Sequence, residues 1–142
     1  MERGRTVPAS PHRPTNDSLM RYYLIITTGW TFSPSAFLGR LRLRWPLVRI
    51  QEPSISRLNT FQDFEFPMGH SVLYGSIDQS GKGVTIDNGA LDDCAEFACW
   101  CRTLIPPSEK VVFFHDSMAI DFILDPDMTL EEIVQAMSAS GN

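Results

Sequence analysis

The chain has 142 residues, 43% of them hydrophobic, and a formal net charge of −5. That length corresponds to one domain, and the apolar content is sufficient for one hydrophobic core. Charged residues make up 20% of the chain, which argues against disorder of its main body. No apolar run approaches the roughly 18 residues of a membrane-spanning helix, so we expect no membrane partner.

The charge is distributed unevenly along the chain. Residues 1–50 contain eight arginines, no lysine and two acids, which gives +6. Residues 51–142 contain four basic and fifteen acidic residues, which gives −11. Such asymmetry indicates charged surfaces and charged partners, or two halves that neutralise each other. It does not indicate a reaction.

The segment 1–19 is predicted to be a flexible tail in front of a single domain over 20–142. It contains three prolines and only two sizeable aliphatic side chains, so it buries too little to offset the entropy of ordering. It has no apolar stretch of the kind that a secretory signal needs. Met20 stands directly before the first expected strand, so translation could start at Met1 or at Met20.

The first strand is predicted over Arg21–Thr28, where β-branched and aromatic residues dominate. A helix follows, because Ser33 suits an N-cap and Pro34 suits the first turn. The helix should run to about Trp45, where Pro46 stops it. Apolar residues recur within it at helical spacing and should face the core: Phe37, Leu38, Leu41 and Trp45.

A short strand over Val48–Ile50 precedes a predicted antiparallel meander. Alternating patterns and turn residues place the three strands of the meander at Phe61–Pro67, Ser71–Ile77 and Val84–Asp87.

A second helix is predicted over Leu91–Ile105. Its apolar stripe contains Cys94, Phe97 or Ala98, Cys101, and Leu104 or Ile105. Val111–Phe114 is a continuous apolar run, which predicts a central strand buried on both faces, and Ile120–Leu124 should form another short strand. Thr129 and Glu132 form a capping box at the start of the last helix.

This order of elements predicts an α+β fold with a mostly antiparallel sheet of about five to six strands and two or three helices packed on one face. The regular βαβ alternation of a doubly wound fold is missing. The sequence also lacks a glycine-rich turn between a strand and a helix, which argues against a nucleotide-binding fold.

Three cysteines lie inside the second predicted helix, within a span of eight residues: Cys94, Cys99 and Cys101. This odd number favours reduced thiols in a cytoplasm over a disulfide framework. No C-x-x-C pair occurs, and Cys99 points away from the helix face that Cys94 and Cys101 share. We therefore expect thiols that pack in the core, with no metal site and no cofactor.

Two histidines, His70 and His115, fall in the expected domain. A Ser-His-Asp arrangement can be drawn from Ser71, His70 and Asp63, but G-x-S-x-G is absent and adjacent strand residues point to opposite faces. A histidine followed by Asp116 is too common a pair to count as a motif. We expect no catalytic residue. The alternative is a small hydrolase or transferase that uses one histidine with Asp63 or Asp116.

Several arginines accompany the first predicted helix: Arg40, Arg42, Arg44 and Arg49. Arginine next to an aromatic residue such as Trp45 suits phosphate and base contacts, so an anion- or nucleic-acid-binding module is a further alternative. The negative net charge argues against a nucleic-acid partner. Pairing of these arginines with the acidic surfaces is the preferred interpretation.

Parts of the chain resemble a group of short, acidic bacterial proteins. The segments concerned are YYLIITTGWTFSP at 22–34, FEFPMGHSVLYGSID at 64–78, DDCAEFACWCRTLIP at 92–106 and VVFFHD at 111–116. From residue 21 to about residue 125, the chain is similar in kind to the small α+β immunity proteins of bacterial toxin–immunity systems. The resemblance implies a protein that binds one cognate toxin and performs no chemistry.

We therefore expect a cytoplasmic, non-catalytic binding protein whose acidic surface neutralises a basic toxin domain, for example a nuclease. The expected partner-binding residues are acids of the meander and second helix with two aromatic side chains: Asp63, Glu65, Tyr74, Asp78, Asp87, Asp92, Asp93, Glu96 and Trp100. If the meander packs beside that helix, some of them should form one negative patch edged by aromatic residues, as in selective interfaces.

Overall fold

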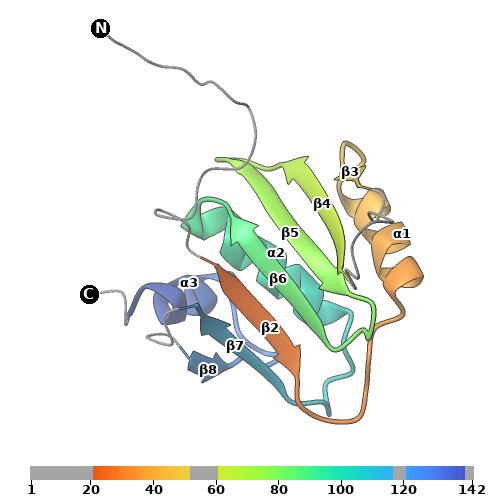
Figure 1. The fold of residues 1–142 in the computed structure, drawn as a ribbon. Helices are drawn as coiled ribbons and strands as arrows, with labels where there is room; N and C mark the ends of the chain where they lie inside the picture. The colour runs from red at the N-terminus through yellow and green to blue at the C-terminus, as the bar shows by residue number, and fades with distance from the viewer. Residues whose placement is uncertain (1–20, 52–60, 117–120, 140–142) are drawn as a thin grey trace, which may run out of the picture.

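A computed structural model describes residues 21–51, 61–116 and 121–139 of the chain. They form a seven-stranded sheet, with antiparallel pairing throughout, and three helices. The fold is therefore α+β, as predicted, with slightly more strands than the expected five to six (Figure 1). The tail predicted over 1–19 lies outside the described residues.

The elements follow the predicted order, and where bounds were predicted they differ by at most two residues. The strands are β2 (Tyr22–Ile26), β3 (Arg49–Ile50), β4 (Phe61–Pro67), β5 (Val72–Asp78), β6 (Gly83–Asn88), β7 (Val111–His115) and β8 (Asp121–Ile123). The helices are α1 (Pro34–Arg44), α2 (Leu91–Thr103) and α3 (Leu130–Ala139). Across the sheet, the strands stand in the order β3-β4-β5-β6-β2-β7-β8.

The starts of α1 and α3 are fixed by the capping residues that the sequence predicts. The hydroxyl of Ser33 accepts a hydrogen bond from the backbone N–H of Ala36 at 3.4 Å. At α3, the N–H of Glu132 donates to Thr129 Oγ1 at 3.1 Å, and the N–H of Thr129 donates to Glu132 Oε1 at 2.9 Å. This reciprocal pair is a capping box and satisfies two donors at the helix start.

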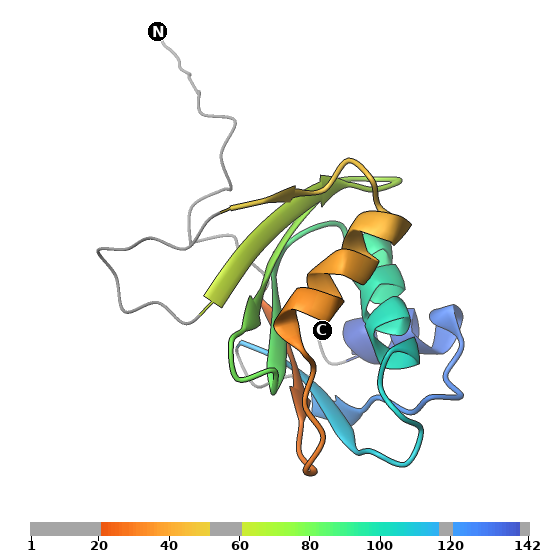
Figure 2. The same ribbon diagram turned by 90° about the vertical axis from the view of Figure 1, so that its right-hand side faces the viewer.

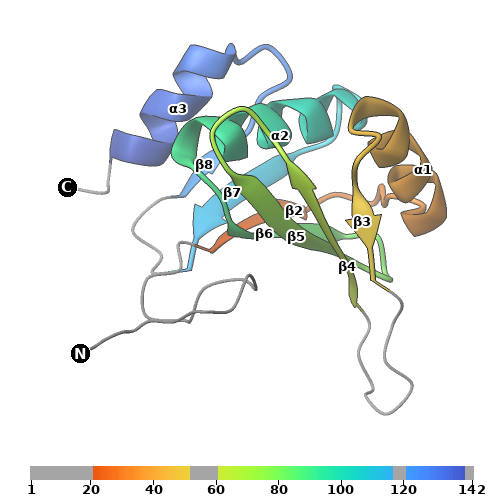
Figure 3. The same cartoon turned by 90° about the horizontal axis from the view of Figure 1, so that it is seen from above.

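All three helices lie on one face of the sheet (Figures 2 and 3). Between the layers, aromatic rings from both sides form the core. The rings of Trp45, which follows α1, and Phe66 of β4 stack with centroids 4.6 Å apart. The ring centroid of Phe97 of α2 lies 5.9 Å from that of Phe64. The predicted apolar stripe of α2 is confirmed, since its members are buried: Cys94, Phe97, Ala98, Cys101 and Ile105.

The prediction that β7 is buried on both faces is wrong. Val111 and Phe113 are fully buried beneath the helices, whereas Val112 and Phe114 are partly exposed on the other face. β7 does pair with a strand on each side, β2 and β8. Its second face is only partly covered because the helices pack on one side of the sheet.

Arg102, near the end of α2, joins three parts of the chain. Its side chain is buried, with the residue 3% exposed. Its Nε donates to the carbonyl of Leu124 at 2.8 Å, Nη1 to that of Ile105 at 3.0 Å, and Nη2 to that of Glu109 at 3.0 Å. The guanidinium thus donates hydrogen bonds to carbonyls of the segment that follows α2 and to one carbonyl of the segment that follows β8.

Candidate protein-binding surfaces

The nine residues predicted to bind a partner are divided between the two sides of the sheet. Four of them belong to α2, which packs on the helix-covered side (Figure 3): Asp92, Asp93, Glu96 and Trp100. On β4 and β5, the strand positions that alternate with buried Phe64 and Leu73 face the opposite, open side. These positions hold Asp63, Glu65, Tyr74 and Asp78. The two groups therefore do not share one surface.

On the open side, the acids of β4 stand opposite polar or aromatic partners. Glu65 is directly opposite Tyr74 of β5 and, across the other edge of β4, opposite Arg49 of β3. Asp63 is opposite Ser76. Directly opposite residues have Cβ atoms about 5 Å apart, so Arg49 is placed to offset part of the negative charge here.

Toward β2, β7 and β8 the open side becomes apolar. The rings of Tyr23 and Phe114 stack with centroids 5.0 Å apart, and Ile25 stands opposite Val112 two positions further along. Ile123 of β8, opposite Val112, is 41% exposed. An aromatic and aliphatic stripe thus lies on the same side as the acids of β4 and β5. This stripe was not predicted from the sequence, although the two-residue period of strands could have indicated it.

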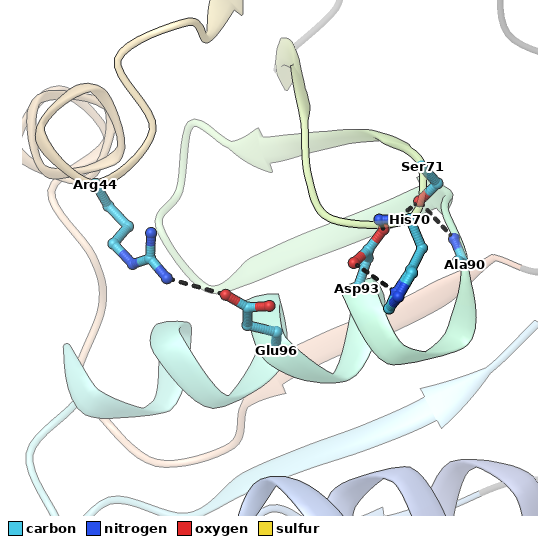
Figure 4. A network of polar contacts seen from close by, with 6 residues as sticks. All are labelled: Arg44, His70, Ser71, Ala90, Asp93 and Glu96. Carbon is cyan, nitrogen blue, oxygen red and sulfur yellow. Dashed lines mark hydrogen bonds and ion pairs between the residues drawn. The ribbon is translucent and has the colours of Figure 1, made fainter.

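Asp93 is buried and binds the turn between β4 and β5. The residue is 2% exposed. Its Oδ2 accepts hydrogen bonds from the backbone N–H of His70 at 2.9 Å and from Ser71 Oγ at 2.7 Å (Figure 4). Ser71 Oγ in turn accepts from the backbone N–H of Ala90 at 2.8 Å. Together these bonds clamp the turn onto the start of α2, so Asp93 is not available to a partner.

The same bonds bear on the hydrolase alternative at His70. The acid beside His70 is Asp93, whose Oδ1 lies 3.7 Å from His70 Nδ1, whereas Asp63 lies on the open side of the sheet. Ser71 donates its hydroxyl proton to Asp93 and not to an imidazole. A serine nucleophile needs a base that receives this proton. The arrangement therefore resembles a structural clamp at a helix start more than a catalytic triad.

His115 and Trp100 both pack against core aromatic residues. The ring of His115 meets that of Tyr22 edge-on at 5.2 Å. Trp100 is partly buried, with its ring 5.2 Å from that of Trp45 and 5.6 Å from that of Phe37. Trp100 thus belongs largely to the core beneath α1.

Two further acids of the predicted set are paired with arginines. Glu96 Oε2 lies 2.9 Å from Arg44 Nη2 (Figure 4). This contact confirms that one arginine of α1 pairs with an acidic surface, as the preferred interpretation expects. Asp87 is 6% exposed, and its Oδ1 lies 3.0 Å from Arg21 Nε. Asp92 is exposed to solvent at the start of α2.

The other arginines of α1 are exposed. Arg40 and Arg42 point to solvent, and between Arg42 and Arg44 stands Leu43, which is 84% exposed. The guanidinium of Arg44 lies over the ring of Trp45, 4.5 Å from its centroid. The ring of Trp45 and the carboxylate of Glu96 therefore both contact Arg44. Arg40 and Arg42 are then the basic groups that α1 presents to solvent.

A dense group of exposed acids lies where β8 meets α3. Residues 121–139 contain five acids and no lysine or arginine. All five are exposed: Asp121, Asp125, Asp127, Glu131 and Glu132. Between β8 and α3 a cavity of about 640 Å³ opens next to three of these acids. These acids were not predicted to bind a partner, although they fall close together in the sequence, within residues 121–132.

The three cysteines are free thiols. Cys94 and Cys101 are buried and Cys99 is partly buried. Burial raises the pKa of Cys94 to about 12 and that of Cys101 well above its ordinary value of 9.0. Over the described ranges, no group of three or more histidine, cysteine or acidic residues could hold a metal ion. Two of the three thiols thus pack in the core.

Over 21–51, 61–116 and 121–139, no helix is long and apolar enough to span a membrane. No protein-family model, curated protein or solved structure matches the chain. Function therefore has to be inferred from the surfaces themselves.

Proposed function

We propose that the protein is a non-catalytic, immunity-type binding protein that neutralises a basic toxin domain through its acidic surface. The observation that carries this proposal is the charge of the chain after β3. Residues 61–116 and 121–139 contain fourteen acids and three basic residues. Such an imbalance creates a negative field that raises the rate at which a basic partner is encountered.

Not all fourteen acids are available to a partner. Asp87 and Asp93 are buried, Glu96 pairs with Arg44, and Glu109 accepts hydrogen bonds from Thr28 Oγ1 and the N–H of Trp30. The available acids lie mainly in two places, on the open side of β4 and β5 and at the β8–α3 end.

The open side also provides aromatic groups that could act as anchors. Tyr74 stands beside Glu65, and the Tyr23–Phe114 stack lies on the same side of the sheet. Aromatic side chains that a partner buries contribute most of the binding energy of many interfaces, while surrounding charges set the encounter rate. A surface with both features suits a tight and selective protein complex.

The test uses the product of the gene next to the one that encodes this chain, if that product is a secreted toxin. Expression of the toxin domain should stop growth, and co-expression of this protein should restore it. With purified components, association should slow markedly as salt rises, while dissociation changes less.

Variants locate the binding surface in the same assay. Reversal of Asp63 and Glu65 together to lysine should slow association, with the fold verified by its melting temperature. Reversal of Arg40 and Arg42 to glutamate is the matched control and should not slow it. Binding that is indifferent to salt and to the acid reversals would refute the acidic-surface proposal.

A further inference from the structure

A groove runs between β8 and α3. Its cavity measures about 640 Å³. Four apolar residues line it, Phe122 and Ile123 of β8, Met128 of the following loop and Ala136 of α3, together with three acids: Asp125, Asp127 and Glu132. Of the two β8 residues, Phe122 faces the helices, because it stands opposite buried Phe113, and Ile123 faces the open side of the sheet. The volume lies within the range of roughly 300–1,000 Å³ that is typical of ligand sites.

β8 is the last strand of the sheet. It pairs with β7 through Val112↔Ile123, Phe113↔Phe122 and Phe114↔Asp121. On its other side, no strand among the described residues pairs with it. The outward N–H and C=O groups of such an edge strand can accept an extended peptide as an additional strand.

The charges around the groove indicate the composition of that peptide. Residues 121–139 contain five acids and no lysine or arginine. Arg102 of α2 interacts electrostatically with Asp125 and offsets part of this charge. The side chain of Glu132 is held in place because its Oε1 accepts a hydrogen bond from the backbone N–H of Thr129. Lysine and arginine side chains have apolar stems and charged ends, so they can cover Phe122 and Met128 and still reach the carboxylates.

We propose that this groove binds an extended, basic segment of a partner protein, which adds as a strand to β8 and places its lysine or arginine side chains beside Asp125, Asp127 and Glu132. The proposal rests on the proposed function in one respect, since it requires a basic protein partner. It adds the place of contact and the conformation of the bound segment. Nucleic acid is disfavoured as an occupant, because its phosphates would meet these acids.

The test uses the full chain and a short synthetic peptide in which lysine and valine alternate. Binding is followed through the backbone amide signals of the isotopically labelled protein. We expect the largest signal changes in β8 and α3, and weaker binding as salt rises. A peptide of the same sequence, N-methylated on the backbone edge that would pair with β8, should bind at least about tenfold more weakly.

A pair of matched variants tests the acids. Asp125→Asn with Asp127→Asn should weaken binding of the alternating peptide roughly fivefold, since two carboxylate charges are lost with little change in shape. Asp63→Asn with Glu65→Gln removes two charges from β4, which four strands separate from β8 in the sheet, and should leave the affinity nearly unchanged. Melting temperatures establish that both variants are folded.

Three results would overturn the groove proposal. They are signal changes confined to the open side of β4 and β5, equal binding of the N-methylated peptide, and equal effects of the two double variants. The first of these leaves the proposed function standing, because a basic partner would still bind an acidic surface. If the peptide shows no salt-dependent binding and the toxin domain is not neutralised either, both proposals fail.

Discussion

Arg102 illustrates how one side chain can serve a structural role that its position in the sequence conceals. In the last turn of α2 a basic residue is expected to face solvent and complement the helix dipole. Arg102 is instead buried. It donates hydrogen bonds to the carbonyls of Leu124 and Glu109, which belong to segments that follow α2 in the chain. Burial lowers the pKa of Arg102, while Asp125 and Glu109 act to raise it.

Replacement of Arg102 by methionine should lower the free energy of unfolding by on the order of 3 kcal/mol, because several buried carbonyls would lose their donors. Urea denaturation measures this loss. Arg42→Met, at an exposed position of α1, is the control and should change the stability by less than about 0.5 kcal/mol. A loss at Arg102 as small as that of the control would show that the carbonyls find other partners.

Because the thiol of Cys94 and the hydroxyl of Tyr22 are buried, we expect the protein to lose stability at alkaline pH. Burial raises the pKa of Cys94 from 9.0 to about 12 and that of Tyr22 from 10.0 to about 12. Their contribution is fully present below pH 9.0. It falls as the pH rises toward about 12, because the unfolded chain releases these protons first.

Urea denaturation at a series of alkaline pH values tests this expectation. Cys94→Ala should cost on the order of 1 kcal/mol near neutral pH through lost buried volume, and should make the alkaline decline shallower. A decline of equal steepness in Cys94→Ala and the parent protein would assign the effect to other groups.

At the scale of elements, the clamp between the β4–β5 turn and α2 separates two neighbouring acids that look equivalent in the sequence. Asp93 is buried and accepts bonds from His70 and Ser71, whereas Asp92 is exposed. Asp93→Ala should therefore destabilise the fold by on the order of 2 kcal/mol, since the loss leaves Ser71 Oγ and the N–H of His70 without this acceptor.

Asp92→Ala serves as the matched control and should cost less than about 0.5 kcal/mol. Both values come from chemical denaturation under identical conditions. Equal costs at the two positions would mean that the clamp contributes little to stability. In that case Asp93 would again be a candidate for partner binding.

The sequence predicts the elements well wherever a local signal sets them. Ser33 and the Thr129–Glu132 pair start their helices as expected. The alternation that predicts β4 puts Phe64 and Phe66 on one face of the strand, and both are buried in the core. The burial of β7 is mispredicted, because an apolar run does not tell whether both faces of a strand are covered.

The candidate surfaces depend on contacts between distant parts of the chain, and so they were harder to predict. Acids that follow one another closely, such as Asp87 and Asp92, differ in exposure: Asp87 is buried on β6, with Arg21 Nε 3.0 Å from its Oδ1, whereas Asp92 is exposed at the start of α2. The acids at the β8–α3 end are close together in the sequence, but their exposure and their position beside the groove depend on how α3 packs beside α2. No local pattern encodes either arrangement.

At the scale of the whole molecule, the helix layer has a basic end and an acidic end. α1 and α3 lie on either side of α2 (Figures 1 and 3). Arg40 and Arg42 are exposed on α1, and Glu131 and Glu132 are exposed on α3. The uneven charge of the sequence is thus only partly neutralised within the fold, through pairs such as Arg44–Glu96.

This arrangement allows a chromatographic test between the acidic-surface proposal and the alternative of an anion- or nucleic-acid-binding module. Near neutral pH the protein carries a formal charge of −5, so an anion exchanger should retain it at low salt. Heparin should not, because the negative field of the whole chain opposes a polyanion more strongly than the exposed Arg40 and Arg42 of α1 attract it. Arg40→Gln with Arg42→Gln should leave both results unchanged. Retention of the parent protein on heparin, with loss of that retention in the double variant, would identify α1 as an anion-binding surface and favour the alternative.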